Sequence, residues 1–136
     1  MTRNQVASLL IACVSLVATL MPPFVMGRFD GFVIWNMFPS VATLILLIPW
    51  TLLENGQGTV LRNPVWMLVG AFVTSAFSLA FQVSWHFDLG GTATASSTAT
   101  LAFIFVPIWA IVFGAAAAFV TFAATAIARR SRNEGA

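Results

Sequence analysis

Four long apolar runs, separated by short polar segments, make up most of the chain. They cover residues 5–25, 32–53, 64–85 and 98–128. A run of roughly 18 or more mainly apolar residues predicts a helix that crosses a membrane. The pattern therefore predicts an all-α fold, an integral membrane bundle of four transmembrane helices that forms a single membrane domain over residues 1–136.

The last run, residues 98–128, is the longest and contains no charged residue. At about 1.5 Å per residue it would extend roughly 46 Å, beyond the roughly 30 Å hydrocarbon core of a bilayer. Such a helix must tilt, protrude or break. Pro107 lacks an N–H and its ring clashes with the carbonyl of residue 103, so the sequence predicts a kink between Phe103 and Pro107.

Small and weakly polar residues recur at helical spacing on every run. Such a row lets another helix backbone approach closely in lipid. On the last run the row is Ala110, Gly114 and Ala118, with Ala117, Thr121 and Thr125 beside it. The other runs carry Ser8, Ala12, Ser15 and Thr19, then Asn36, Ser40 and Thr43, and finally Gly70, Thr74, Ser78 and Gln82.

Each row has two interpretations. Ala110, Gly114 and Ala118 pack either within their own chain or against another subunit. Asn36 and Gln82 either tie helices together by hydrogen bonds or meet a solute in a hydrated interior. Packing is favoured in each case, because it needs no further component.

The polar segments are predicted to be turns and linkers that connect the helices. Arg28 and Asp30 lie in a glycine-bounded turn, and residues 54–62 form a polar linker. Asn63 is predicted to cap the third helix, and Ser96, Ser97 or Thr98 the fourth. Met1 to Gln5 and the tail after Ala128 complete the polar ends.

Composition and charge agree with a membrane location. The chain is 60% hydrophobic and 7% charged, which excludes an ordinary soluble domain and makes the lipid bilayer the expected partner. With both termini on one side, five arginines lie on that side and Arg28 alone lies on the other; these five are Arg3, Arg62, Arg129, Arg130 and Arg132. The positive-inside rule therefore predicts cytoplasmic termini in a cell inner membrane, and no nucleic-acid partner is expected.

No catalytic, cofactor or metal site is expected. The four acidic residues lie outside the apolar runs, and the single cysteine, Cys13, and the single histidine, His86, have no ligand partners at a useful spacing. Residues 10–13 resemble a lipoprotein cleavage box, but the chain stays apolar through Leu20, so an uncleaved helix is favoured. We therefore do not expect an enzyme.

The run SSTATLAFIFVPIWA, residues 96–110, resembles the opening of the last helix in small four-span bacterial membrane proteins. The resemblance supports four spans and implies no activity. The sequence thus predicts a small multi-pass inner-membrane protein of structural or accessory type, which acts through helix–helix association in a homo-oligomer or a larger membrane complex. The alternative is an oligomeric channel or transporter for a small uncharged or weakly charged solute.

Overall fold

Four long helices form the protein. A computed structural model describes residues 3–27, 29, 31–53, 65–91 and 101–134. The elements are α1 (Arg3–Met26), α2 (Gly31–Leu53), α3 (Val65–His86), the short 3₁₀ turn η1 (Leu89–Gly91) and α4 (Ala102–Glu134). The predicted all-α fold with four helices is confirmed.

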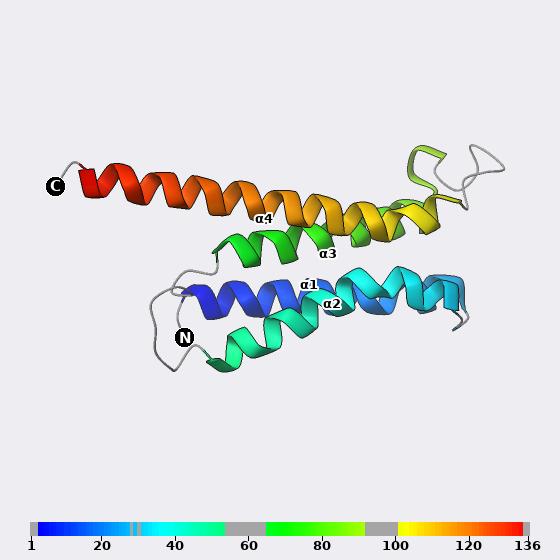
Figure 1. Cartoon of the computed structure of the whole chain (residues 1–136). Helices are drawn as coiled ribbons and strands as arrows, with labels where there is room; N and C mark the ends of the chain where they lie inside the picture. The colour runs from blue at the N-terminus through cyan, green and yellow to red at the C-terminus, as the bar shows by residue number, and fades with distance from the viewer. Residues whose placement is uncertain (1–2, 28, 30, 54–64, 92–100, 135–136) are drawn as a thin grey trace.

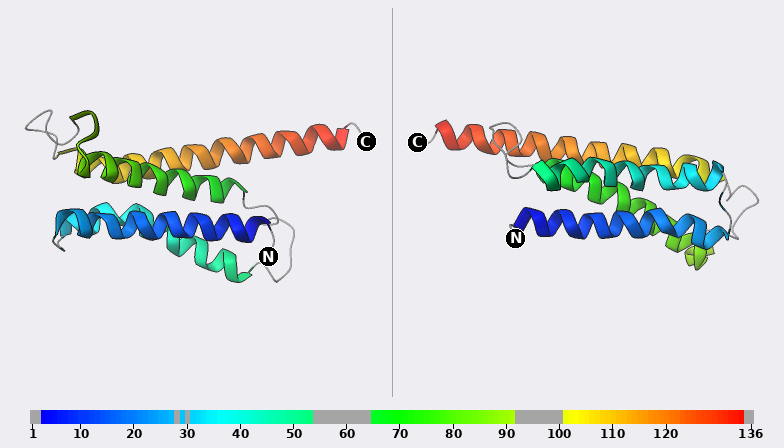
Figure 2. Two further views of the ribbon diagram at one scale, coloured as in Figure 1. Left: turned by 180° about the vertical axis from the view of Figure 1, so that it is seen from behind. Right: turned by 90° about the horizontal axis from the view of Figure 1, so that it is seen from below.

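The helices run up and down along one axis (Figure 1). Both chain termini lie at one end of the bundle, here called the terminal end, and the opposite end is called the distal end. α1 packs against α2 and α3, and α4 packs against α3 and α2. The described residues of α1 and α4 do not meet, so these helices occupy opposite corners, as both views of Figure 2 agree.

Three of the helices, α1, α3 and α4, are long and apolar enough to cross a membrane. In α2, a helix of 23 residues, the apolar stretch among the described side chains is the shorter segment Val33–Leu47. By length and composition, three helices are thus able to cross a membrane, and the fourth has a shorter apolar segment among its described side chains.

The first three helices begin and end within two residues of their predicted limits. α4 does not end at residue 128 as predicted, because it continues to Glu134. Residues 129–134 contain neither glycine nor proline, and arginine and glutamate favour helix, so the charges end the apolar run without ending the helix. At its other end, Leu101 lies in a 3₁₀ turn and α4 begins at Ala102, whereas the predicted start at Thr98 lies outside the described residues.

α4 continues through Pro107 as a single helix. Pro107 lies in the second turn and has no N–H to donate to the helical hydrogen-bond ladder. The Pro107 side chain is fully buried. A proline this close to the start of a helix interrupts the hydrogen-bond ladder at one position and leaves a long ladder beyond it.

Glycine terminates α1. Gly27 has a φ of 60°, and its N–H donates a 3.0 Å hydrogen bond to the carbonyl of Pro23. This left-handed conformation after the last turn is the usual glycine stop for a helix. Several predicted features of the connections lie outside the described residues: the Arg28–Asp30 turn, the 54–62 linker, the Asn63 cap and the Ser96–Thr98 cap.

Candidate functional site

The closest approach of two helix backbones lies between α3 and α4. A Cβ added to Gly70 would lie 2.9 Å from the Ala118 Cβ and 3.0 Å from the Gly114 carbonyl oxygen. A Cβ added to Gly114 would overlap the Thr74 hydroxyl and lie 2.8 Å from the Gly70 carbonyl oxygen. The structure thus places Gly114 and Ala118 against Gly70 and Thr74 of the same chain.

Aromatic rings flank this contact along the same two helices. Trp66 packs edge-on against Phe122 toward the terminal end, with ring centroids 5.9 Å apart. Toward the distal end, Trp85 packs edge-on against Phe103 at 4.6 Å. These pairs fix the register of α3 against α4, because one pair lies on each side of the Gly70–Gly114 contact.

Three buried hydroxyls meet at the centre of the bundle. Ser15 of α1, Thr43 of α2 and Ser75 of α3 form what is here called the hydroxyl cluster. The Oγ atoms of Ser15 and Ser75 lie 2.7 Å apart, and Thr43 Oγ1 lies 3.1 Å from the Ser15 oxygen and 2.9 Å from the Ser75 oxygen. The cluster joins three helices by side-chain hydrogen bonds in a region without access to solvent.

The hydroxyl cluster uses all its hydrogens internally. Thr43 also lies 2.8 Å from the carbonyl oxygen of Ser40, a bond in which its hydroxyl is the donor. Each hydroxyl has one hydrogen, so three hydrogens serve four contacts. The cluster therefore has no spare donor for a ligand, and its direct effect is to fasten α1, α2 and α3 together.

The polar interior continues from the hydroxyl cluster toward the distal end. α2 and α3 are antiparallel, so three residues back along α2 matches three residues forward along α3. Ser40 is thus level with Ser78, and Asn36 with Gln82, and all four side chains are buried. Three of their atoms have no hydrogen-bond partner: Ser40 Oγ, Ser78 Oγ and Gln82 Oε1.

The interior toward the terminal end is apolar. Ile11, Leu47, Leu68 and Ala71 form a buried cluster next to the hydroxyl cluster, here called the apolar plug. They come from the same faces of α1, α2 and α3 that carry the hydroxyls one turn away. The buried side chains of α2 and α3 next to the hydroxyl cluster are thus polar on its distal side, here called the polar distal half, and apolar on its terminal side. Apolar side chains such as Val33 and Phe103 are also buried at the distal end, and Ser8 of α1 is buried at the terminal end.

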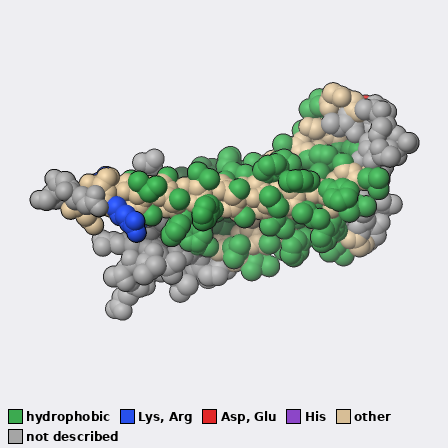
Figure 3. All heavy atoms as spheres, turned by 45° about the horizontal axis from the view of Figure 1, so that its top comes forward, with side chains coloured by type: hydrophobic (Ala, Val, Ile, Leu, Met, Phe, Trp, Pro, Cys, Tyr) green, Lys and Arg blue, Asp and Glu red, His purple; other side chains and the backbone are tan. Residues whose placement is uncertain are grey.

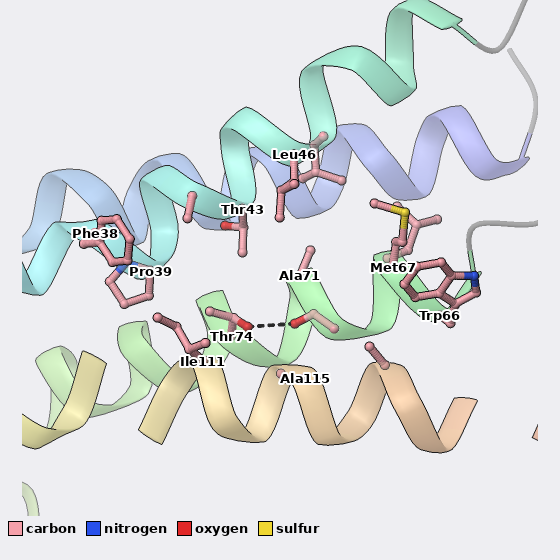
Figure 4. A pocket seen from close by; sticks show the side chains of 16 residues that line it. Phe38, Pro39, Thr43, Leu46, Trp66, Met67, Ala71, Thr74, Ile111 and Ala115 are labelled. Carbon is pink, nitrogen blue, oxygen red and sulfur yellow. Dashed lines mark hydrogen bonds between the residues drawn. The ribbon is translucent and has the colours of Figure 1, made fainter. Parts of the chain in front are cut away.

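A groove opens on the surface between α2 and α4, with α3 as its floor. Its volume is about 410 Å³, and its lining is mainly apolar. Figure 4 shows Phe38 and Leu46 of α2 on one side, Ile111 and Ala115 of α4 on the other, and Ala71 and Thr74 of α3 between them. The Thr74 hydroxyl donates to the Gly70 carbonyl at 2.9 Å, and the Thr43 hydroxyl belongs to the hydroxyl cluster. Both hydroxyls that line this α2–α4 groove are thus engaged within the chain.

The outer surface matches a lipid environment. Hydrophobic side chains cover the face around α4 in Figure 3, and the basic side chains on this face lie at the terminal end, where α4 carries Arg129, Arg130 and Arg132. His86 is exposed and its ring contacts Phe87 at 4.8 Å between centroids, and Cys13 is exposed on α1. Neither residue lies in the hydroxyl cluster or the groove.

Ser75 is the site residue that the sequence reasoning missed. The predicted α3 row followed a strict four-residue spacing, and each such step turns by about 40° around the helix. Gly70 and Thr74 consequently face α4, whereas Ser78 and Gln82 lie on the core side. Alternating steps of three and four, which give Leu68, Ala71, Ser75, Ser78 and Gln82, would have identified the core face.

Searches of family models, curated proteins and solved structures found nothing that matches the chain.

Proposed function

We propose that the chain is a small multi-pass protein of a bacterial inner membrane that acts as a structural or accessory subunit through helix–helix association. The observation that carries the proposal is the α2–α4 groove. It lies between α2 and α4 over α3, of which α3 and α4 have membrane-spanning length and apolarity, and its lining is mainly apolar.

The shape of the groove suits a helix. Its floor and inner wall are built from small residues, Gly70, Ala71, Gly114, Ala115 and Ala118, and its rims from large ones, including Phe38, Leu46, Trp66 and Ile111. Helices associate in lipid by close packing of this kind, because lipid supplies no hydrophobic drive of its own. Both hydroxyls are engaged internally, so the groove offers little to a polar solute.

The orientation belongs to the same proposal. Arg129, Arg130 and Arg132 lie near the end of α4, at the terminal end of the bundle. The positive-inside rule then places this end, with both termini, in the cytoplasm and the distal end outside. The partner helix is supplied by a second copy of the chain or by a larger membrane complex.

Site-directed photocrosslinking tests the proposal. Benzoylphenylalanine placed at Ala115, which lines the groove, should give a protein adduct in native membranes. The matched control is the same probe at Ala116, which is exposed on α4 but turned away from the groove by about 100°. We expect an adduct at position 115 that is much stronger than at position 116.

The mass of the adduct identifies the partner. An adduct of twice the mass of the chain supports a homo-oligomer, and an adduct of another mass supports a larger complex. Equal or absent protein adducts at both positions, with only lipid attached, would contradict a role in helix association.

A further inference from the structure

We propose that the polar distal half of the bundle is a buried binding site for small uncharged molecules that both donate and accept hydrogen bonds, of which water is the smallest. The site lies between α2 and α3 and is closed toward the terminal end by the apolar plug. This inference goes beyond helix association and does not depend on what occupies the groove, although Leu47, Leu68 and Ala71 of the plug also line the groove.

Three buried polar atoms in this part of the bundle have no hydrogen-bond partner in the protein. Ser40, Ser78 and Gln82 are only 0%, 1% and 3% exposed, yet Ser40 Oγ, Ser78 Oγ and Gln82 Oε1 make no hydrogen bond within the protein. A buried polar atom left unsatisfied costs about 1–3 kcal/mol. Buried polar groups in proteins are generally paired with protein atoms or with bound water.

The register of α2 and α3 places Ser40, Ser78 and Gln82 on the distal side of the hydroxyl cluster. Thr43 and Ser75 are in direct contact at 2.9 Å, which sets the register of the antiparallel pair α2 and α3. Three residues further toward the distal end on each helix, Ser40 and Ser78 are at the same level. Gln82 follows one turn further along α3. The oxygens of Ser40 and Ser78 are therefore at one level on two neighbouring helices, and Gln82 Oε1 lies one turn further toward the distal end.

The residues of α1 and α4 nearest to the level of Ser40 and Ser78 are small. By the same register, Ala18 of α1 and Ala110 of α4 are the residues nearest to the level of Ser40 and Ser78, and both are fully buried. Ala18 and Ala110 thus offer no polar atom to the two serine hydroxyls, which leaves a bound molecule as the partner that can pair with them. A water molecule needs two to four polar partners, and this level provides the two serine hydroxyls.

The chemistry of the atoms selects the ligand class. Gln82 Oε1 only accepts, whereas each serine hydroxyl donates and accepts, so the ligand must supply at least one donor. No described buried residue is charged, so nothing compensates the cost of burying an ion. Water, or a small alcohol or amide, meets these conditions.

The apolar plug sets the limit of the site. Ile11, Leu47, Leu68 and Ala71 offer no hydrogen-bonding side chain to continue a chain of bound molecules toward the terminal end. We therefore expect the plug to close the site, here called the chamber, toward the terminal end, so that no molecule is conducted through the chain.

Water-edited solid-state NMR of the full chain in bilayers of deuterated lipid tests this inference. Magnetisation from water protons should reach the Gln82 side-chain amide and the Ser78 side chain several-fold faster than the methyl groups of Leu47 and Leu68. Ile108, which is exposed on α4, controls for water that arrives through the lipid. In Ser78→Ala, transfer to Gln82 should fall, because one partner of the bound water is lost.

Two results would overturn the inference. If transfer to Gln82 and Ser78 were as slow as transfer to Leu47 and Leu68, the site would be dry. If proteoliposomes showed water permeability well above protein-free vesicles, the plug would not close the chamber. Fast transfer together with vesicle-like permeability supports the proposal, and a folded Ser78→Ala spectrum ensures that lost transfer is not lost structure.

Discussion

The indole N–H of Trp35 on α2 donates a 3.0 Å hydrogen bond to the carbonyl oxygen of Ile104 on α4. The acceptor lies three residues before Pro107, in the part of α4 where the proline disturbs the regular ladder. The Trp35 ring also stacks on Phe38, with centroids 6.3 Å apart and planes at 4°. A side chain on one helix thus bonds the backbone of another close to the proline, and it ties α2 to α4 at the distal end.

Trp35→Phe should weaken this tie while keeping an aromatic ring beside Phe38. Hydrogen bonds between helices in membranes average about 0.6 kcal/mol and reach about 1.7 kcal/mol, so we expect a loss of unfolding free energy in that range. Titration with SDS, followed by circular dichroism in mixed micelles, measures it. Trp109→Phe is the matched control, because the indole of Trp109 is exposed. An equal loss in both variants would contradict a specific role for the Trp35 bond.

Gly114→Ala should separate α3 and α4. The new methyl group would overlap the Thr74 hydroxyl and lie 2.8 Å from the Gly70 carbonyl oxygen, which is backbone and leaves little room for adjustment. Forced overpacking costs about 1–3 kcal/mol, so the midpoint of SDS unfolding should shift clearly to lower detergent. Ala116→Val, which adds more volume at an exposed position of the same helix, should change stability by less than about 0.5 kcal/mol. A stable Gly114→Ala protein would show that the helices do not meet here.

Thr43→Val should break the hydroxyl cluster at its best-connected member. Valine matches the shape of threonine but removes the contacts to Ser15, Ser75 and the Ser40 carbonyl. We expect a loss of about 1–2 kcal/mol, because Ser15 and Ser75 still pair with each other. Thr125→Val is the control, since the Thr125 hydroxyl bonds to a carbonyl of its own helix, that of Phe122. In a double-mutant cycle with Ser75→Ala, additive losses would mean that Thr43 and Ser75 do not interact.

A reporter fused after Ala136 tests the orientation. With the termini in the cytoplasm, a fluorescent protein that folds only in the cytoplasm should be bright, and alkaline phosphatase at the same position should be inactive. Replacing Arg129, Arg130 and Arg132 with glutamine should lower the fraction of chains in this orientation. Phosphatase activity in the fusion to the unmodified chain would reverse the proposed topology.

The fold was largely predictable because lipid imposes simple requirements. Apolar runs of spanning length have to be helices, and the small rows on α1 and α2 correctly include Ser15 and Thr43, which the structure brings together. The meeting of Ser75 with them was not predictable from a four-residue spacing, since the slow rotation of that row leads from the α4 side to the core side. The α2–α4 groove depends on how three helices diverge, which no single helix encodes. The end of α4 was missed because hydropathy locates the membrane, whereas helix propensity decides where the helix stops.

α4 has a further consequence for the depth at which the bundle sits. With 33 residues against 22 in α3, it is roughly 16 Å longer than its neighbour. The contact of Trp66 with Phe122 places this excess beyond the start of α3, at the terminal end. As one continuous helix, α4 thus holds Arg129, Arg130 and Arg132 beyond the part of the bundle in which it packs against α3. Burying guanidinium groups among acyl chains is costly, so we expect the length of α4 to limit how thick a bilayer the helix can match.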